Sequence, residues 1–228
     1  MPVQPASREP GGLSSLRAGY GLVSSSSDLI AASTLSIQRR SAFSRSALNR
    51  AIFSAASGSV GVFAVQLAKH FGARVTGVCS TANLDLVKSL GADAVVDYTR
   101  EDFSSAGRVY DAVLDTVGQA GFSRTLKSLK RGGPYVRIAP SGGIKWTRVL
   151  MSILGDTLRE MWISMTGAAK IIGGLPRIAP GDLSFLKGLI EAGEVRTVID
   201  RCFSFDQAAE AYRYAEAGHK KGHVLLLP

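Results

Sequence analysis

Hydrophobic and polar positions alternate regularly along the chain from Ala51 onward, and the period of the alternation changes several times. A short apolar run at Ile52 is followed by a turn of small residues and by an apolar-rich segment at helical spacing that extends to Phe71. This stretch predicts a strand, a tight turn and a helix that stops at Gly72. Similar units follow it, so we expect strands that alternate with helices.

The later elements are predicted from short apolar runs bounded by turn residues. Strands are expected at 75–79, 94–96, 111–115, 135–138 and 168–172, and then at 198–203 and 224–227. Helices are expected at 84–90, 122–129, 183–190 and 208–215, and Asp182 and Asp206 are predicted to cap the last two. This order predicts an α/β fold, a doubly wound parallel sheet of about six strands covered on both faces.

The first 46 residues differ in kind from the rest. They contain a serine run at 24–27 and the basic pair Arg39-Arg40, and they lack apolar periodicity. A Ser-rich, Arg-rich and acid-poor composition is typical of a mitochondrial transit peptide, whereas the Pro and Gly residues at the start do not favour a helix. The other interpretation is an N-terminal extension that is unstructured or an artefact of the gene model.

The overall composition limits the possible partners. The chain has 228 residues with 46% hydrophobic content, enough for a sizeable core in one large or two small domains. The net charge is +9, of which +4 lies in residues 1–50, so the excess elsewhere is thin. No dense Lys/Arg stripe with interleaved aromatic residues occurs, and we therefore expect no nucleic-acid partner.

Cysteine and histidine usage argues against a disulfide framework and against a metal site. The only cysteines are Cys79 and Cys202, and the three histidines have no Cys or carboxylate neighbours at metal-ligand spacing. The apolar segment 144–172 is interrupted by charged residues, so we expect a packed helix or an oligomer interface there, not a membrane span. A reducing compartment, cytoplasmic or alternatively mitochondrial, is the expected location.

The turn after the first strand is the strongest candidate for ligand binding. Its pattern Ala56-x-Gly58-x-x-Gly61 is a variant of the dinucleotide fingerprint, in which small residues allow the tight turn and the close approach of backbone N–H groups to a pyrophosphate. Such turns also join ordinary strands and helices, but the strand at 75–79 falls where a βαβ unit requires it. The predicted pyrophosphate-binding residues are Ala56, Ser57, Gly58, Ser59, Val60 and Gly61.

Several motifs in order resemble one known family. The strings SAASGSVGVFAVQLAKHFGARVTGVCSTANLDLVKSLGADAVVDYTREDF, YDAVLDTVG, LKRGGPYV and AEAGHKKGHVLLL are similar to the zinc-independent branch of the medium-chain dehydrogenase/reductases, which includes NADPH quinone oxidoreductases and enoyl-reductase-like proteins. The resemblance implies a six-stranded Rossmann domain at 47–178, after the atypical segment 1–46, and a C-terminal α/β extension at 179–228.

Family members also carry an N-terminal GroES-like domain, which the residues before Ala51 do not resemble, so the chain looks like a truncated member. In the family the C-terminal segment packs on that domain. We therefore expect exposed apolar surface around the last helix and strand, with homo-oligomerisation or instability as a result.

The residues after the second strand bear on the choice of cofactor. An NAD site usually places an acid at this strand end, but Ser80 and Thr81 stand here and no acid occurs before Asp85. We therefore predict NADPH over NADH. Loop chemistry alone would also explain these hydroxyls. The resemblance adds further expected contacts and one departure, because Asn83 stands near the place of the usual cation and Arg100 is the candidate substitute. The predicted residues of the adenosine and nicotinamide ends are Ser80, Thr81, Asn83, Tyr98, Thr116 and Val117.

The reaction that the resemblance implies is metal-free hydride transfer from NADPH to a quinone or an α,β-unsaturated carbonyl. The cofactor carries this chemistry and the protein orients it. The sequence offers no acid–base pair or nucleophile to which a catalytic role can be assigned. Two alternatives stay open: a non-catalytic NADPH-binding or scaffold protein, and a methyltransferase or other nucleoside binder.

Overall fold

The computed structural model describes residues 49–105, 107, 109–116, 122–138, 165–172, 180–218 and 220–228. The predicted boundaries after residues 46 and 178 lie outside these ranges, as do Val117 and the part of the apolar segment that spans 144–164. Among the described helices, none has the length and apolar character that a membrane span requires.

The first strand–turn–helix unit forms as the apolar pattern predicts. Strand β1 (Arg50–Ser54) leads through a tight turn into helix α2 (Ser59–His70), which ends before Gly72, and β2 (Arg74–Cys79) follows. Gly72 has a positive φ of 83°, a conformation that glycine adopts without steric cost at a helix C-terminus. Strands β1 and β2 pair in parallel, so these elements form a βαβ unit.

Six parallel strands form the main sheet, which confirms the predicted Rossmann-type α/β fold. The strand order is β3-β2-β1-β4-β5-β6. The order reverses between β1 and β4, and in such sheets ligands bind outside the carboxyl ends of the strands at this point. The further elements are the 3₁₀ helix η4 (Thr81–Asn83), α3 (Leu84–Ser89), β3 (Ala94–Asp97), β4 (Ala112–Asp115), α4 (Phe122–Ser128), β5 (Pro134–Arg137) and β6 (Lys170–Ile172).

Two hydrophobic clusters occupy the opposite faces of this sheet. Side chains of a strand point alternately to the two faces, so Phe53 joins the cluster under α2 and α3 while Ile52 joins the cluster on the other face. Leu114 and Val113 divide in the same way on β4. Burial on both faces explains why these strands are apolar runs and not alternating ones.

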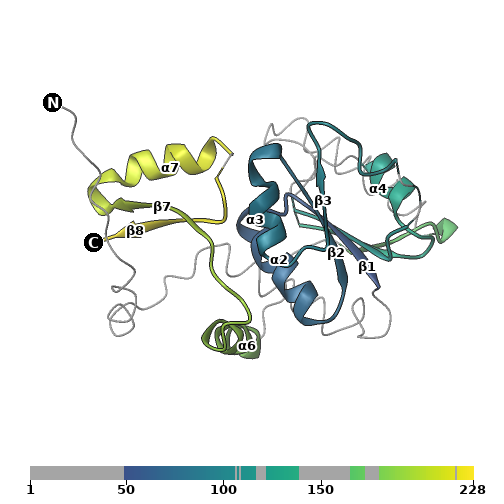
Figure 1. The fold of residues 1–228 in the computed structure, drawn as a ribbon, viewed down its shortest axis with the longest axis horizontal. Helices are drawn as coiled ribbons and strands as arrows, with labels where there is room; N and C mark the ends of the chain where they lie inside the picture. The colour runs from purple at the N-terminus through teal and green to yellow at the C-terminus, as the bar shows by residue number, and fades with distance from the viewer. Residues whose placement is uncertain are drawn as a thin grey trace.

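The C-terminal extension forms a second, smaller α/β unit. It consists of α6 (Pro180–Glu191), β7 (Ile199–Ser204), the 3₁₀ helix η5 (Phe205–Gln207), α7 (Ala208–Glu216) and β8 (His223–Leu227). Strands β7 and β8 pair in parallel as a separate two-stranded sheet that α7 covers (Figure 1). Leu186 and Leu189 of α6 join the core beneath α2.

Both predicted helix caps in this unit are wrong. Helix α6 begins at Pro180, so Asp182 lies inside its first turn; proline suits the start of a helix because its missing N–H would have no acceptor there. At the next helix, Ser204 forms a capping box with Gln207, and Asp206 lies within the 3₁₀ turn. The Ser204 side chain accepts a hydrogen bond from the backbone N–H of Gln207, the third residue of the turn. Asp206 lies inside the turn, so it does not occupy the cap position.

The predicted exposed apolar surface is confirmed among the described residues. Phe205 is 59% exposed and Tyr212 on α7 is 68% exposed. Leu226 and Leu227 of β8 are also exposed, although the apolar run there predicts a buried strand. We call Ile199, Phe205, Tyr212, Leu226 and Leu227 the C-terminal apolar surface.

Candidate functional site

The turn between β1 and α2 is tight because its backbone approaches the helix closely. Ala55 adopts a left-handed conformation with a φ of 50°, which is uncommon for a residue with a side chain. Its carbonyl accepts a hydrogen bond from the Gly58 N–H at 3.0 Å. A Cβ at Gly61 would lie 2.2 Å from that same carbonyl oxygen, so only glycine fits there. Glycine at position 61 is therefore what allows α2 to pack this closely against the turn.

The first turn of α2 presents unpaired backbone donors. Gly58 is the N-cap residue and provides no side chain to cap the helix. The N–H groups of a first helical turn have no acceptor inside the helix, and the helix dipole adds partial positive charge at the same place. Helix α2 has 12 residues and no acidic residue in its first turn. Its N-terminus is therefore suited to an anion.

A lysine from the far end of the chain lies at this helix N-terminus. The Lys220 ammonium donates hydrogen bonds to the Ser59 hydroxyl and, at 2.9 Å, to the Gly222 carbonyl. The Ser59 hydroxyl donates to the same Gly222 carbonyl at 2.8 Å. Lys220 is not among the site residues predicted from the sequence, although the Lys220-Lys221 pair before the last apolar run could have indicated it.

Partial burial lowers the pKa of Lys220, while Asp200 acts in the opposite direction. A lysine at the positive end of a helix dipole is electrostatically unfavourable unless a negative charge accompanies it. Lys220 and the first turn of α2 together thus form a donor-rich position that a bound anion would complete.

Backbone contacts hold the C-terminal loop against the glycine turn. The Gly222 N–H donates to the Ser57 carbonyl at 2.8 Å, and Gly58 and Gly222 form an isolated parallel bridge. Gly222 has a φ of 63°, and a Cβ there would lie 2.3 Å from the Val198 carbonyl oxygen. Glycine at this position therefore allows the loop that carries Lys220 to pass close to the backbone of Val198.

Asn83 connects the glycine turn to the end of β2. Its Nδ2 donates to the Ser57 hydroxyl at 3.0 Å and to the Ser80 hydroxyl at 3.2 Å. Asn83 is 8% exposed, and its Oδ1 has no hydrogen-bond partner in the described part of the chain. A buried acceptor without a donor is costly, so a hydroxyl of a bound ligand would satisfy it. The structure thus brings three predicted residues together.

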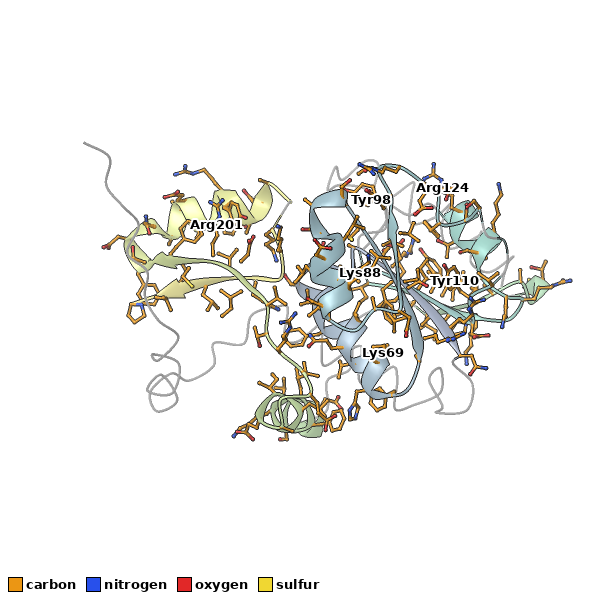
Figure 2. All side chains as sticks on the ribbon, viewed as in Figure 1. Lys69, Lys88, Tyr98, Tyr110, Arg124 and Arg201 are labelled. Atoms are coloured by element: carbon orange, nitrogen blue, oxygen red, sulfur yellow. The ribbon has the colours of Figure 1, made fainter. Side chains whose placement is uncertain are left out.

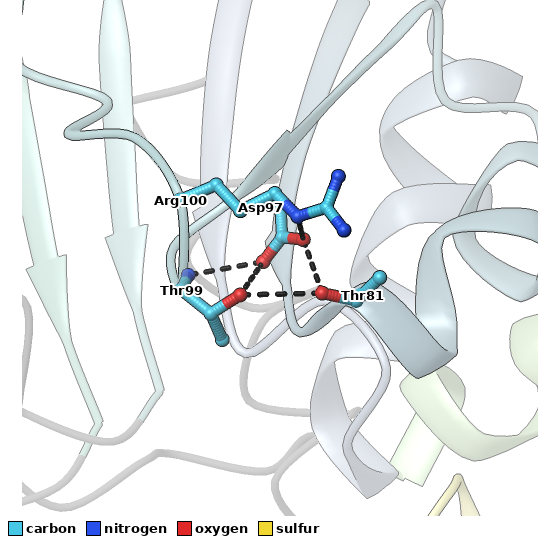
Figure 3. A network of polar contacts seen from close by, with 4 residues as sticks. All are labelled: Thr81, Asp97, Thr99 and Arg100. Carbon is cyan, nitrogen blue, oxygen red and sulfur yellow. Dashed lines mark hydrogen bonds and ion pairs between the residues drawn. The ribbon is translucent and has the colours of Figure 1, made fainter.

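Thr81 belongs to a polar network around Asp97 that the sequence pattern did not predict (Figure 3). The Thr81 hydroxyl donates to Asp97 Oδ2, and the Thr99 hydroxyl donates to Asp97 Oδ1 at 2.7 Å. The Arg100 Nε lies 3.7 Å from Asp97 Oδ2. Hydrogen bonds from Thr81 and Thr99 lower the pKa of Asp97 and so favour its charged form. An acid is therefore present at this sheet edge, supplied by β3 and not by β2.

Tyr98 follows β3 directly and is 58% exposed (Figure 2). Its backbone N–H donates to the Cys79 carbonyl at 3.2 Å, which keeps it beside the end of β2. Tyr98 therefore stands at the predicted adenosine end with a largely free aromatic ring.

Thr116 lies at the switch point, where β1 and β4 end side by side. Its hydroxyl donates to the Ser54 carbonyl at 3.0 Å, and the Ser54 hydroxyl donates to Asp115 at 2.6 Å. The buried Asp115 also accepts a hydrogen bond from the Tyr135 hydroxyl at 3.2 Å. Burial and the neighbouring Asp115 raise the pKa of Tyr135, so this phenol stays neutral. Val117 lies outside the described residues.

An open cavity of about 400 Å³ lies elsewhere, at the C-terminal end of α2. Its lining includes Lys69, His70 and Glu194, and the His70 Nδ1 lies 2.5 Å from Glu194 Oε2. Figure 2 shows Lys69 and Tyr98 at opposite ends of the Rossmann unit, so this cavity is separate from the candidate cofactor site. In the described ranges no group of three or more His, Cys, Asp or Glu side chains is arranged to hold a metal ion.

Comparisons with known proteins agree with the fold. A family model described as zinc-binding dehydrogenase matches residues 90–226. The chain is 34% identical over 182 residues to the chloroplastic quinone-oxidoreductase QR1 of Triphysaria versicolor, which covers 78% of this chain and 52% of that protein. It is 33% identical over 194 residues to the mitochondrial NAD(P)H oxidoreductase RTN4IP1 of Mus musculus, covering 78% of this chain and 47% of that protein.

The quinone oxidoreductase of Coxiella burnetii is a similar solved structure. It superposes with a TM-score of 0.68 and 25% identity, over 87% of this chain and 58% of that one. The chain thus spans about half the length of the curated relatives it matches. Since the family model covers more than half of the chain and the solved relative superposes on its fold, the chain belongs to the zinc-binding dehydrogenase family, in the quinone oxidoreductase-like branch of the medium-chain dehydrogenase/reductases.

Proposed function

We propose that the chain binds NADPH and forms the cofactor-binding part of an oxidoreductase that reduces a quinone or an α,β-unsaturated carbonyl without a metal ion. The observation that carries this proposal is the anion position made by the first turn of α2 together with Lys220. Relatives named as quinone oxidoreductase and as NAD(P)H oxidoreductase support the class of reaction.

The pyrophosphate would bind at the N-terminus of α2. The residues that would hold it are the backbone N–H groups of the first turn, the Ser59 hydroxyl and the Lys220 ammonium. A pyrophosphate there would add negative charge beside the lysine and the positive end of the helix, in addition to that of Asp200. This charge balance supports a phosphate-containing cofactor over an uncharged nucleoside such as that of a methyltransferase substrate.

The adenosine end would lie along the carboxyl ends of β2 and β3. Ser80, Tyr98 and Arg100 offer two hydroxyls and a cation that is 75% exposed, and these groups favour a ribose that carries a 2′-phosphate. The absence of an acid at the end of β2 itself supports NADPH over NADH. Asn83 Oδ1 would accept from a ribose hydroxyl.

The nicotinamide end would lie beyond Thr116, where β1 and β4 diverge. A reduced nicotinamide supplies a hydride when bound, and this chain would orient it. The described residues include no acid–base pair at this edge with a free catalytic role, since Asp115 is engaged by Ser54 and Tyr135. We accordingly assign no catalytic residue.

A non-catalytic NADPH-binding protein is the second candidate. The C-terminal apolar surface favours it, because exposed apolar surface of this kind serves association with another protein domain or a second copy. Relatives carry chloroplastic and mitochondrial names, and we propose a cytoplasmic or mitochondrial location for this chain.

Two measurements test the proposal in sequence. Titration of NADPH, NADH and S-adenosylmethionine by calorimetry should give saturable binding of NADPH, weaker binding of NADH and none of S-adenosylmethionine. Consumption of NADPH at 340 nm with quinones and enones then separates the candidates. Turnover supports the oxidoreductase, and tight binding without turnover supports the non-catalytic protein. Failure of both nicotinamide cofactors to bind would overturn the proposal.

A further inference from the structure

Asp97 is the last residue of β3 and lies beside the end of β2, where the proposed site would distinguish NADPH from NADH. Strands β2 and β3 pair in parallel so that Cys79 is the register partner of Asp97. The residues just after Cys79 therefore lie beside the Asp97 carboxylate, and Thr81 contacts it directly (Figure 3). An acid that the chain places many residues later thus lies next to the end of β2, the strand that carries the acid in a conventional NAD site.

The direction of the hydrogen bonds decides what Thr81 offers to a ligand. An ionised carboxylate only accepts hydrogen bonds, so the proton of the Thr81 hydroxyl is directed to Asp97. The Thr99 hydroxyl and the Thr99 N–H, at 2.7 and 3.0 Å, also donate to Asp97. The Thr81 oxygen therefore has only lone pairs left for a bound ribose.

This arrangement treats the two cofactors differently. A ribose 2′-hydroxyl of NADH can donate to the Thr81 oxygen, whereas a 2′-phosphate mainly accepts hydrogen bonds and finds no donor there. The negative charge of Asp97 also repels a phosphate of two negative charges more than it repels a hydroxyl.

Asp97 in addition competes for the nearest cation. The Arg100 Nε lies 3.7 Å from Asp97 Oδ2, while the Arg100 side chain is 75% exposed. A phosphate that recruits Arg100 would have to draw it away from this carboxylate. The pair is solvent-exposed on the arginine side, so the competition is moderate and not prohibitive.

We propose that Asp97 is a specificity-determining residue that reduces the preference of this chain for NADPH over NADH. It does so by orienting the Thr81 hydroxyl as an acceptor and by pairing with the charge of Arg100. The inference rests on the proposed function, since it concerns the ribose end of the same cofactor site. It assigns Asp97 a positioning role that acts through Thr81 and Arg100.

The test is the ratio of the dissociation constants of NADH and NADPH, measured by cofactor fluorescence in wild type and in Asp97→Asn. Asparagine keeps the shape but removes the charge and can leave the Thr81 hydroxyl free to donate. We expect NADPH to bind at least about threefold more tightly and NADH to bind no better, since one unit of charge is removed near the phosphate. An unchanged ratio would overturn the inference.

A control variant and a second independent variant complete this test. Asp102→Asn removes the same charge from a carboxylate in the following loop that lies 3.7 Å from Arg124, and its ratio should stay within about twofold of wild type. Thr81→Val removes the acceptor and one hydrogen bond to Asp97 but keeps the carboxylate, to which Thr99 still donates, and NADH should then lose more affinity than NADPH. An equal loss for both cofactors, or a larger loss for NADPH, would contradict the inference even if Asp97→Asn fails to fold. If wild type binds neither cofactor, the proposed function fails instead.

Discussion

Lys220 donates a hydrogen bond from its ammonium group to the hydroxyl of Ser59, across 161 residues of sequence. This contact joins the loop before β8 to the first turn of α2 (Figure 1). Hydrogen bonds to two different parts of the chain hold this loop in place. The Gly222 N–H donates to the Ser57 carbonyl, and the Lys221 N–H donates to the Asp200 carboxylate at 2.9 Å. The candidate anion position at the Rossmann turn therefore includes a cation from the C-terminal unit and does not belong to the βαβ unit alone.

Replacement of the lysine, Lys220→Met, should weaken NADPH and NADH equally. The pyrophosphate is common to both cofactors, and loss of one charge-assisted hydrogen bond costs about 1.5 kcal/mol, or about tenfold in affinity. Cofactor fluorescence titration measures both constants. The neighbouring Lys221→Met is the matched control and should bind as wild type, since its backbone N–H and not its ammonium makes the contact to Asp200. Unchanged affinity in Lys220→Met would remove this residue from the site.

Gly61→Ala should destabilise the fold strongly. The added Cβ would lie 2.2 Å from the Ala55 carbonyl oxygen and 2.7 Å from the Ala56 backbone, so α2 must shift from the turn. We expect a loss of about 2–3 kcal/mol in the free energy of unfolding, measured by urea denaturation. Gly188→Ala in α6 meets no atom within 4 Å and should stabilise the protein slightly, because alanine favours helices. Comparable losses in both variants would contradict the steric explanation.

Asp111 should make stability depend on acid pH. It accepts hydrogen bonds from the Arg50 N–H at 2.8 Å and from the Lys130 ammonium at 2.6 Å. Burial acts to raise the pKa of Asp111, but these partners outweigh burial and lower it. Since the folded pKa lies below the unfolded value of about 3.9, its stabilisation is present above about pH 4 and is lost as the pH falls through the folded pKa.

Thermal denaturation of Asp111→Asn between pH 7 and pH 2 checks this. The variant should be less stable than wild type by about 1 kcal/mol near neutral pH, and the difference should disappear in strong acid. Asp206→Asn, at an exposed residue of η5, is the control and should keep the wild-type profile. A difference that is the same at every pH would exclude the charge as its cause.

The two cysteines should react at very different rates with a thiol reagent. Cys79 is buried in β2, and burial together with the nearby Asp97 raises its pKa to about 11, so little thiolate exists at neutral pH. Cys202 is exposed on β7. Reaction with a chromogenic disulfide should release one equivalent in the native protein and two after denaturation, and Cys202→Ser should abolish the fast equivalent. Two fast equivalents in native wild type would show that β2 opens readily.

The C-terminal apolar surface should drive self-association. Phe205 and Tyr212 are its most exposed members at 59% and 68%. The double variant Phe205→Ser with Tyr212→Ser should shift the sedimentation profile toward monomer and reduce the fluorescence of a dye that binds apolar surface. The control is Ala209→Ser, a substitution at an exposed residue of the same helix. A monodisperse wild-type monomer with no dye binding would contradict this prediction.

Local pattern was sufficient to predict most of the elements. The apolar run at β1, the small-residue turn and the helical spacing of α2 each follow from neighbours in sequence, so the strand–turn–helix unit appears where it was expected. Helix starts were less accurate at Asp182 and Asp206, because a nearby proline and a serine compete for the cap positions.

The sequence by itself determined the parallel α/β order, the glycine turn and the hydroxyls of Ser80 and Thr81, since each depends on residues a few positions apart. Only the tertiary structure decided which groups meet them. Parallel pairing places Asp97 beside Thr81, and the return of the chain after α7 places Lys220 on Ser59. Strand register and chain return are set by packing of the whole core, which no local spacing encodes. For that reason Asp97, which we assign to cofactor choice, and Lys220, which we assign to cofactor affinity, could be identified only from the fold.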